Sequence, residues 1–295
     1  MIKQTLMFTK PAALSLKDRQ LVIDVRDADQ IVTRPIEDIG FVVVENQMVR
    51  MTVPLLNALA DNNVSVIFCD NKAMPRSMLM SLEGNTTLQE SYRYQIDASE
   101  PTKKRLWKQI VESKIRNQAA LLSRVGKDGE QLKPYYMNVK SGDSDNREGG
   151  AARIYWGKLF EKGFLRDREG DAPNSLLNYG YAILRAAVAR ALVGSGLFPA
   201  FGLFHRNRYN AYPLADDMME PYRPFVDEIV YRLHIDKGVE ELDKASKAEL
   251  LKVLTADVVM GKNLRPLQIA LSMTTASLLK VFKGEESKLT LPTFV

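Results

Sequence analysis

The chain has 295 residues, of which 45% are hydrophobic and 26% are charged, so it can bury a large core, and its length favours two domains over one. A formal net charge of +5 mildly favours a polyanionic partner, but the excess is too small to identify one. The single cysteine, Cys69, excludes a disulfide framework and a thiolate metal site, and the lack of a secretory leader or of an apolar run of about 18 residues predicts a soluble intracellular protein with no membrane partner.

Residues 1–75 are predicted to form a small β-rich domain. The segments LSLKDRQLVIDV, FVVVENQMVRMTV and NVSVIFCD are rich in Val and Ile, alternate in part between apolar and polar residues, and are separated by turn-prone clusters. Between the last two segments, residues 54–60 place their leucines at helical spacing. We therefore expect a small sheet domain with one short helix.

The composition changes after Asp70. The stretch that follows has little hydrophobic periodicity and contains Pro75, Gly84 and two threonines, a composition typical of an inter-domain linker. We therefore assign residues 76–90 to a linker.

Residues 91–295 have a helical pattern almost to the end. Ser99 and Asn174 each precede long stretches of apolar residues at helical spacing, so both are predicted helix N-caps. Ser246, with Glu249 three residues later, is predicted to form a capping box at the start of another helix. The sequence thus predicts a two-domain α+β chain, in which the larger domain is all-α.

The segment 202–228 contains the most suggestive group of polar side chains. One of only two histidines, His205, lies ahead of the carboxylates Asp216, Asp217 and Glu220. If the acidic stretch is helical, Asp217 and Glu220 share one face, with about 5–6 Å between their Cβ atoms, and form a chelating pair. An imidazole and two carboxylates suit Mg²⁺ or Mn²⁺ better than a zinc site built on thiolates.

Each histidine also has a structural interpretation. A lone histidine is more often structural than a ligand, and His234 is interpreted in that way because it lies near a predicted helix C-terminus. For His205, the nearby Asn207 and Asn210 are expected to orient the ring, and such hydrogen bonds fix which ring nitrogen faces a metal.

The acids of this segment also have local explanations. Asp216 is placed as a helix N-cap, and Asp217 and Glu220 are also consistent with first-turn acids that stabilise a helix dipole. Pro221 and Pro224 predict that the helix is bent or begins late, because each removes a backbone donor.

A third acid, Glu148, is available in the segment SDNREGGAARIYWGKLF. Asp145 lies three residues before it, so a capping box explains Glu148 without a metal. Gly149 and Gly150 at a helix start are instead typical of places where a backbone or a ligand approaches closely. From the residues alone, the role of Glu148 stays open.

Basic residues form two groups: Lys103, Lys104, Arg105 and Lys108 in a predicted helix, and Arg206, Arg208 and Arg223 around the acids. A solvated helix face is the more common role for the first group. The second group lies where a phosphodiester substrate beside a carboxylate-bound metal requires positive charge. We predict DNA contacts for the second group and, from the first, for Lys103 and Lys104.

The sequence carries no competing catalytic signature. It has no Walker loop, no Gly-X-Ser-X-Gly elbow, no dinucleotide-binding glycine fingerprint and no Cys/His nucleophile pair. None of these motifs therefore indicates a reaction other than a metal-dependent reaction on a phosphodiester.

The segment NYGYAILRAAVARALVGSGLFPAFGLFHRNRYNAYPLADDMMEPYRPFVD closely resembles the core signature of the CRISPR-associated adaptation integrase, the first Cas protein (Cas-one). The segments RPIEDIGFVVVEN, LLNALADNNVSVIFCD and NREGGAARIYW resemble the family's other blocks in the same order, so the resemblance covers nearly the whole chain. The short chain length and the sequence motif ADDMMEPYRP resemble those of the type II branch of the family.

The resemblance implies metal ligands at Glu148, His205 and Glu220, with Asp217 as an accessory acid. Many branches of the family have Asp where this chain has Glu220, which leaves open whether Asp217 or Glu220 coordinates more directly. The family fold, a β-sandwich-like N-terminal domain followed by a larger helical catalytic domain, agrees with the pattern above, and the N-terminal domain is expected to dimerise.

The resemblance also implies a function. The 3′-hydroxyls of short prespacer DNA are joined to the repeat edges of a CRISPR array by transesterification that depends on Mg²⁺ or Mn²⁺, in the cytoplasm of a prokaryote. The implied assembly is two homodimers bridged by a Cas-two homodimer. Two alternatives are a stand-alone metal-dependent DNA nuclease, which uses water as the nucleophile, and a non-catalytic DNA-binding scaffold, which needs the acids only as caps.

Overall fold

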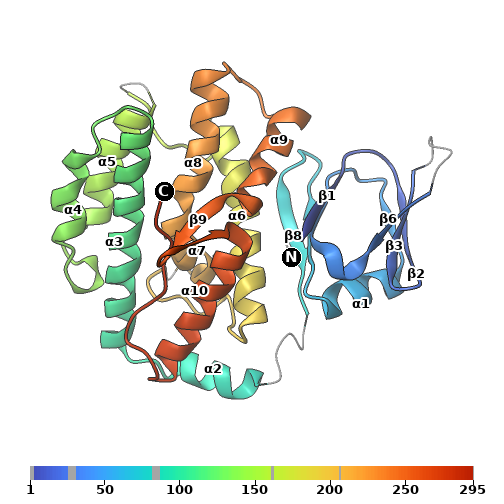
Figure 1. The fold of residues 1–295 in the computed structure, drawn as a ribbon, viewed down its shortest axis with the longest axis horizontal. Coiled ribbons are helices and arrows are strands. Elements are labelled where there is room, and N and C mark those ends of the chain that lie inside the picture. Colours follow the sequence, from blue (N-terminus) through green and yellow to red (C-terminus); the bar gives the residue numbers. More distant parts are fainter. Residues whose placement is uncertain (1–2, 26–30, 82–86, 161–162, 206, 295) are drawn as a thin grey trace. The chain divides into compact units, whose positions relative to one another are not determined.

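A computed structural model describes residues 3–25, 31–81, 87–160, 163–205 and 207–294. The chain divides into two compact units, residues 1–86 and 87–295. The first unit is β-rich and the second is mainly helical, which confirms the predicted fold class (Figure 1).

The first unit contains two four-stranded sheets. One sheet has the order β1 (Gln4–Phe8), β5 (Ile39–Val44), β7 (Ser65–Cys69) and β8 (Pro75–Leu79). The other has the order β4 (Val32–Pro35), β3 (Gln20–Asp24), β2 (Ala13–Lys17) and β6 (Arg50–Met51). In the first sheet β1, β5 and β7 are parallel, while β8 runs antiparallel to β7.

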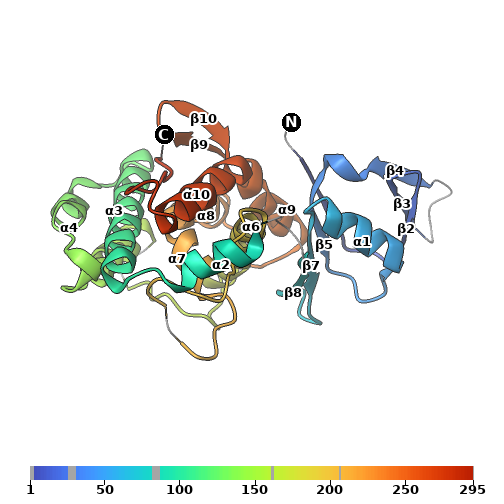
Figure 2. The same cartoon turned by 90° about the horizontal axis from the view of Figure 1, so that it is seen from below.

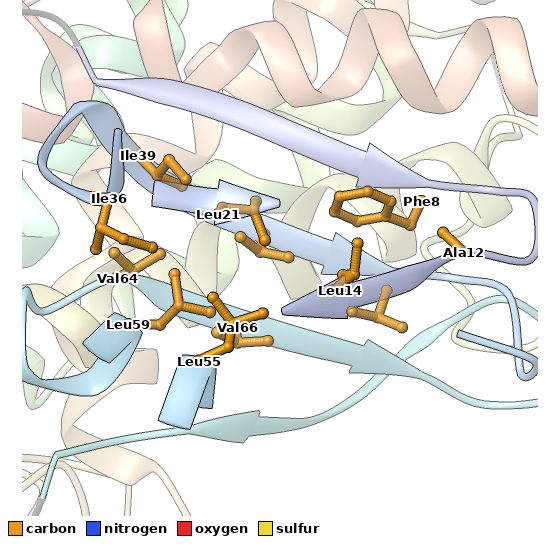
Figure 3. Close-up of a cluster of buried hydrophobic side chains, with 12 residues drawn as sticks. Phe8, Ala12, Leu14, Leu21, Ile36, Ile39, Leu55, Leu59, Val64 and Val66 are labelled. Atoms are coloured by element: carbon orange, nitrogen blue, oxygen red, sulfur yellow. The ribbon is translucent and has the colours of Figure 1, made fainter. Parts of the chain in front are cut away.

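Side chains from both sheets and from helix α1 (Val53–Asp61) form a single hydrophobic core (Figure 3). Ile39 and Leu21 come from different sheets, Leu55 comes from α1, and all three are fully buried. Every residue of β5 is buried, which explains why its sequence, IGFVVV, is continuously apolar rather than alternating. The single cysteine, Cys69, is buried at the end of β7.

The segment expected to be a linker begins inside this sheet. Residues 76–79 belong to β8, which pairs with β7 from Val66 to Cys69. Residues 82–86 lie outside the described part of the chain, and helix α2 (Leu88–Ile96) follows. Apolar and polar residues do not alternate in the sequence of β8, PRSML. The reason is that β8 is an edge strand in which every position is exposed or half-buried.

The second unit is built around two long helices. These are α3 (Glu100–Arg124) and α6 (Asn174–Gly194). The remaining helices are α4 (Lys133–Met137), α5 (Arg147–Leu159), α7 (Pro213–Met219), α8 (Arg223–Tyr231), α9 (Lys244–Leu251) and α10 (Leu267–Phe282). Figure 1 shows α4 and α5 beside α3, while α7, α8, α9 and α10 all pack on α6.

Helix α6 is long and apolar enough to cross a membrane by length and composition alone. However, 78% of its most apolar window is buried within the unit, as in the core helix of a globular fold. Gly180 of α6 allows α8 to approach closely, because a Cβ atom at this position would lie 2.4 Å from Val226. The close contact therefore holds α8 against α6 in the core of the unit.

The larger unit is not all-α. Strands β9 (Asp257–Met260) and β10 (Asn263–Pro266) form an antiparallel hairpin beside α10 (Figure 2). The connection is short and carries Gly261 at a positive φ of 64°, a conformation that favours glycine. The hairpin was not predicted, because helical patterns precede and follow it in the sequence.

The predicted helix starts agree with the structure at one position of three. Ser99 caps α3 and accepts a hydrogen bond from the backbone N–H of Thr102. Asn174 is the first residue of α6 rather than its cap, which is Pro173. The predicted capping box at Ser246 is wrong, because Asp243 caps α9 and accepts a hydrogen bond from the Ser246 N–H at 2.7 Å.

Candidate active site

Glu148 lies at the start of α5, but it does not belong to a capping box. The N-cap is Asn146, which has a left-handed φ of 52° and accepts a hydrogen bond from the Gly149 N–H at 3.1 Å. Asp145 instead pairs with Arg147 at 2.8 Å. The capping explanation for Glu148 is therefore wrong, and its carboxylate is available to other partners.

The two glycines after Glu148 provide space for protein side chains. A Cβ atom at Gly149 would lie 2.7 Å from the side chain of Asn146, and one at Gly150 would lie 2.6 Å from the ring of Tyr135. Both glycines therefore have close neighbours, but these are the side chain of the helix cap and an aromatic ring rather than the backbone or ligand that the sequence predicted.

Glu220 belongs to a short 3-10 helix, Glu220–Tyr222, between α7 and α8. Its side chain is only 4% exposed, and Oε1 accepts a hydrogen bond from Arg223 Nε at 2.8 Å. Burial raises the pKa of Glu220, but Arg223 and Lys114 outweigh burial and hold that pKa well below its usual range. Pro221 and Pro224 lie at the starts of the 3-10 helix and of α8, where the helix is interrupted, as predicted.

Lys114, which the sequence did not single out, joins the two glutamates. Its Nζ lies 2.5 Å from Oε1 of Glu148 and 2.5 Å from Oε2 of Glu220. Burial lowers the pKa of Lys114, but the two carboxylates outweigh burial and raise it, so the ammonium is charged. Two acids that are 72 residues apart in the chain therefore share one cation.

Asp217 was predicted to form a chelating pair with Glu220, but its carboxylate has other partners. Its fully buried carboxylate accepts hydrogen bonds from the backbone N–H groups of Leu203, Phe204 and His205. The same carboxylate lies 2.6 Å from Nδ1 of His205. Asp217 thus fixes both the loop and the ring of His205, whereas the sequence predicts that Asn207 and Asn210 orient the ring.

The neighbouring polar residues are used locally. Asp216 lies inside α7 rather than at its N-cap, which is Tyr212, and accepts a hydrogen bond from Asn210 Nδ2 at 2.7 Å. Asn207 accepts a hydrogen bond from the Tyr209 N–H. These contacts shape the loop between α6 and α7.

The tautomer of neutral His205 follows from its contact with Asp217. Nδ1 donates to the carboxylate, so Nε2 carries the free lone pair, and the side chain is 39% exposed. The hydrogen bond to Asp217 raises the pKa of His205, partial burial opposes this effect, and Glu220 contributes to the rise. Glu220 is therefore close enough to His205 for their charges to interact.

The predicted basic residues are placed in different surroundings. A cleft of about 510 Å³ beside His205 is lined by Lys103 and Arg208, together with the exposed ring of Phe201. Lys104 is exposed on α3, and Arg206 lies outside the described residues. Arg223 is the counter-ion of Glu220 and also lies over the ring of Tyr181. DNA contact by these residues stays a prediction.

The two glutamates and Lys114 form one buried charged cluster. Within the described ranges, no three His, Cys, Asp or Glu side chains are grouped so that they can hold a metal as they stand. The Lys114 ammonium instead contacts both Glu148 and Glu220. Buried Glu220 Oε2 has this charge contact but no hydrogen bond of acceptable geometry, so it is an acceptor suited to a cation.

Behind the site, Asp227 forms a buried network with two tyrosines. It accepts hydrogen bonds from the hydroxyls of Tyr155, at 2.7 Å, and Tyr181. Burial raises the pKa of Asp227 to about 6, although both hydroxyls and Arg223 favour its ionised form. The folded protein therefore holds this proton more tightly than the unfolded chain does.

We expect Asp227→Asn to reveal that proton. Below about pH 4 the carboxyl is protonated in both states. Between about pH 4 and pH 6 the unfolded chain ionises while the folded wild type keeps its proton, so the free energy of unfolding decreases until the folded state also ionises. Asparagine lacks this titration. In urea denaturation, the free energy of unfolding of the variant relative to that of the wild type should therefore rise by up to roughly 3 kcal/mol between pH 4 and pH 7.5. A difference in free energy of unfolding that does not change with pH would contradict the raised pKa of Asp227.

Comparison with known proteins identifies the family to which the residues point. Residues 6–258 match the family model described as CRISPR associated protein Cas1. The chain belongs to the Cas1 family. It is 39% identical over 254 residues to the CRISPR-associated endonuclease Cas1 of Neisseria meningitidis serogroup C, covering 85% of this chain and 83% of that protein.

Solved structures agree with this membership of the Cas1 family. A casposase bound to an integration product has a TM-score of 0.80 at 20% identity, with 98% of this chain and 92% of that one covered. A Cas1 protein from Thermotoga maritima has a TM-score of 0.76 at 16% identity, with 96% and 98% covered. At these identities, the likeness shows a shared fold.

Proposed function

We propose that this Cas1-family chain is a metal-dependent DNA integrase and endonuclease of CRISPR spacer acquisition. One observation carries the proposal: Glu148 and Glu220 converge on a single cation, Lys114 Nζ, at 2.5 Å each. Beside them, Asp217 orients His205 so that Nε2 is free. Two carboxylates and an imidazole are a suitable donor set for Mg²⁺ or Mn²⁺.

Glu148, Glu220 and His205 are the residues proposed to hold the metal, while Asp217 supports His205 from behind. A bound Mg²⁺ or Mn²⁺ supplies Lewis-acid stabilisation of the charge that develops on phosphate oxygens. Because the carboxylate of Asp217 is occupied by four hydrogen-bond donors, Glu220 is the better candidate for direct coordination.

The reaction exchanges one phosphodiester bond for another. The 3′-hydroxyl of a prespacer loses its proton and its oxygen bonds to the phosphorus at a repeat edge, while the target strand's own 3′-oxygen leaves and takes up a proton. The bonds broken and made are equivalent, so no nucleotide hydrolysis is required. Arg223 adds fixed positive charge beside Glu220, where phosphate oxygens are expected to lie.

Similar proteins support this choice of substrate. The casposase structure contains an integration product, and other structures of similar fold are a Cas1–DNA complex and a complex with Cas2. We propose that this chain likewise acts on prespacer and repeat DNA with Cas2, as two homodimers bridged by one Cas2 dimer. The N-terminal β-rich unit is the proposed site of dimerisation.

Strand transfer with purified components tests the function. The full chain, Cas2, a prespacer with labelled 3′ ends and a repeat-containing plasmid should yield covalently joined DNA with Mg²⁺ or Mn²⁺, and none with EDTA. Cleaved DNA without joined product would replace integration by the nuclease activity that the relatives' names carry. DNA binding with neither product would leave only a scaffold, although the side chains of Glu148 and Glu220 pair with cations and neither residue is a helix N-cap.

A further inference from the structure

Lys114 occupies a position where a lysine is unusual. It lies in the middle of α3 between the fully buried side chains of Val111 and Ile115, and its own side chain is only 11% exposed. Burying an ammonium costs considerable free energy unless the charge is paired. Its partners therefore explain why it is tolerated.

The partners are the two proposed metal-binding glutamates. Lys114 Nζ lies 2.5 Å from Glu148 of α5 and 2.5 Å from Glu220 of the 3-10 helix. One side chain on α3 thereby connects two elements that are distant in sequence. Without a cation at this point, two carboxylates would face each other in a largely buried space and repel.

The four side chains of this ion-paired group have balanced charges. Glu148 and Glu220 carry two negative charges, while Lys114 and Arg223 carry two positive charges. Addition of a divalent cation to this group without any other change would leave an excess of two positive charges. Arg223 contacts Oε1 of Glu220, whereas Lys114 contacts both acids, so Lys114 is the cation whose removal frees the most donor atoms.

We propose that Lys114 is a positioning residue that holds Glu148 and Glu220 together in the metal-free protein by occupying the cation position, and that it competes directly with the divalent ion for these carboxylates. The inference rests on the proposed metal-dependent function. It adds a role for a residue on α3: metal binding requires the Lys114 side chain to move out of contact with at least one glutamate.

The competition predicts an effect of Lys114→Met on metal affinity. If the wild type must first populate a minor arrangement with Lys114 displaced, its apparent affinity is reduced by that small population, so the variant should bind Mn²⁺ at least about tenfold more tightly. Isothermal titration calorimetry on the full chain measures the two dissociation constants. Equal or weaker binding by the variant overturns the proposal.

Stability without metal provides a second readout. In EDTA, Lys114→Met should lower the melting temperature on the order of 10 °C, because two largely buried acids lose their shared partner. Saturating Mn²⁺ should restore most of that loss. A variant whose melting temperature stays depressed in saturating Mn²⁺ shows that Lys114 is structural only, and contradicts the proposal.

Two variants serve as controls. Lys114→Arg retains the charge and should keep the Mn²⁺ affinity near that of the wild type. Lys108→Met removes a lysine of the same helix that pairs with Glu112 at 3.6 Å, and should change neither readout. An affinity gain in Lys108→Met equal to that of Lys114→Met would overturn the proposal, because a general loss of charge would then explain both.

A measurement on the wild type covers the case in which Lys114→Met does not fold. A crystal structure of the wild type grown with Mn²⁺ should show Lys114 Nζ out of contact with Glu148 or Glu220. Mn²⁺ bound by both acids while both contacts persist overturns the inference alone. If the wild type binds no Mn²⁺ in calorimetry and transfers no strands with it, the proposed metal-dependent function fails, which is a different result.

Discussion

Glu148→Ala is expected to reduce strand transfer by at least about a thousandfold, because it removes one of two carboxylates that converge on the proposed metal position. The fold should survive. Glu148 is 23% exposed, its side chain caps no helix, and Lys114 keeps Glu220 as a partner. Labelled prespacer joined to repeat DNA gives the activity, and thermal denaturation of the same preparation gives the stability.

Glu130→Ala is the matched control for this change. Glu130 is 78% exposed and pairs only at the surface with Lys133, at 3.3 Å, so its loss should leave strand transfer unchanged. Full activity in Glu148→Ala would remove Glu148 from the site. Loss of activity together with loss of the folded state would assign it a structural role instead.

The features predicted well are those with a local cause. Ser99 caps α3 because a side-chain oxygen three residues before a free N–H satisfies it whatever the surroundings are. The Val-rich segment that forms β5 was likewise recognised as a strand from its composition. Such patterns depend on neighbours in the chain, so they can be recognised without a tertiary structure.

The errors arose where two local solutions compete. Asp145 and Asn146 are both good caps for α5, and only the left-handed backbone at Asn146 decides between them. In the same way, Asp243 rather than Ser246 begins α9. The sequence contains the capping residues but does not say which backbone conformation is adopted, and an error of one to three residues follows.

The sequence singled out Glu148, His205, Asp217 and Glu220 but did not predict the contacts that they make. Spacing within one helix suggested that Asp217 and Glu220 work together. The carboxylate of Asp217 instead contacts His205, whereas that of Glu220 contacts Lys114 and Arg223. Lys114 was missed because its partners lie 34 and 106 residues further along the chain. A charged residue on the apolar stripe of α3 was the available signal.

Asp217→Asn is expected to reduce strand transfer by about 10- to 100-fold, the usual effect of removing a hydrogen-bonded carboxylate behind a metal-binding histidine. The cause should be visible at His205. Loss of the carboxylate removes the interaction that favours the imidazolium, while burial still opposes it, so the pKa of His205 should fall from its raised value. Proton NMR titration is simple here because the chain has only two histidines, and His234 serves as an internal reference.

Asp216→Asn distinguishes this specific hydrogen bond from a general loss of negative charge. Asp216 is the adjacent residue, but it bonds to Asn210 rather than to the ring, so its replacement should lower the pKa of His205 far less and spare most activity. If both variants shift His205 equally, the hydrogen bond to Asp217 is not what sets the ring. If Asp217→Asn leaves the pKa of His205 unchanged but abolishes strand transfer, Asp217 acts directly on the metal or the substrate. Asp217 would then replace Glu220 as the better candidate for direct coordination of the metal.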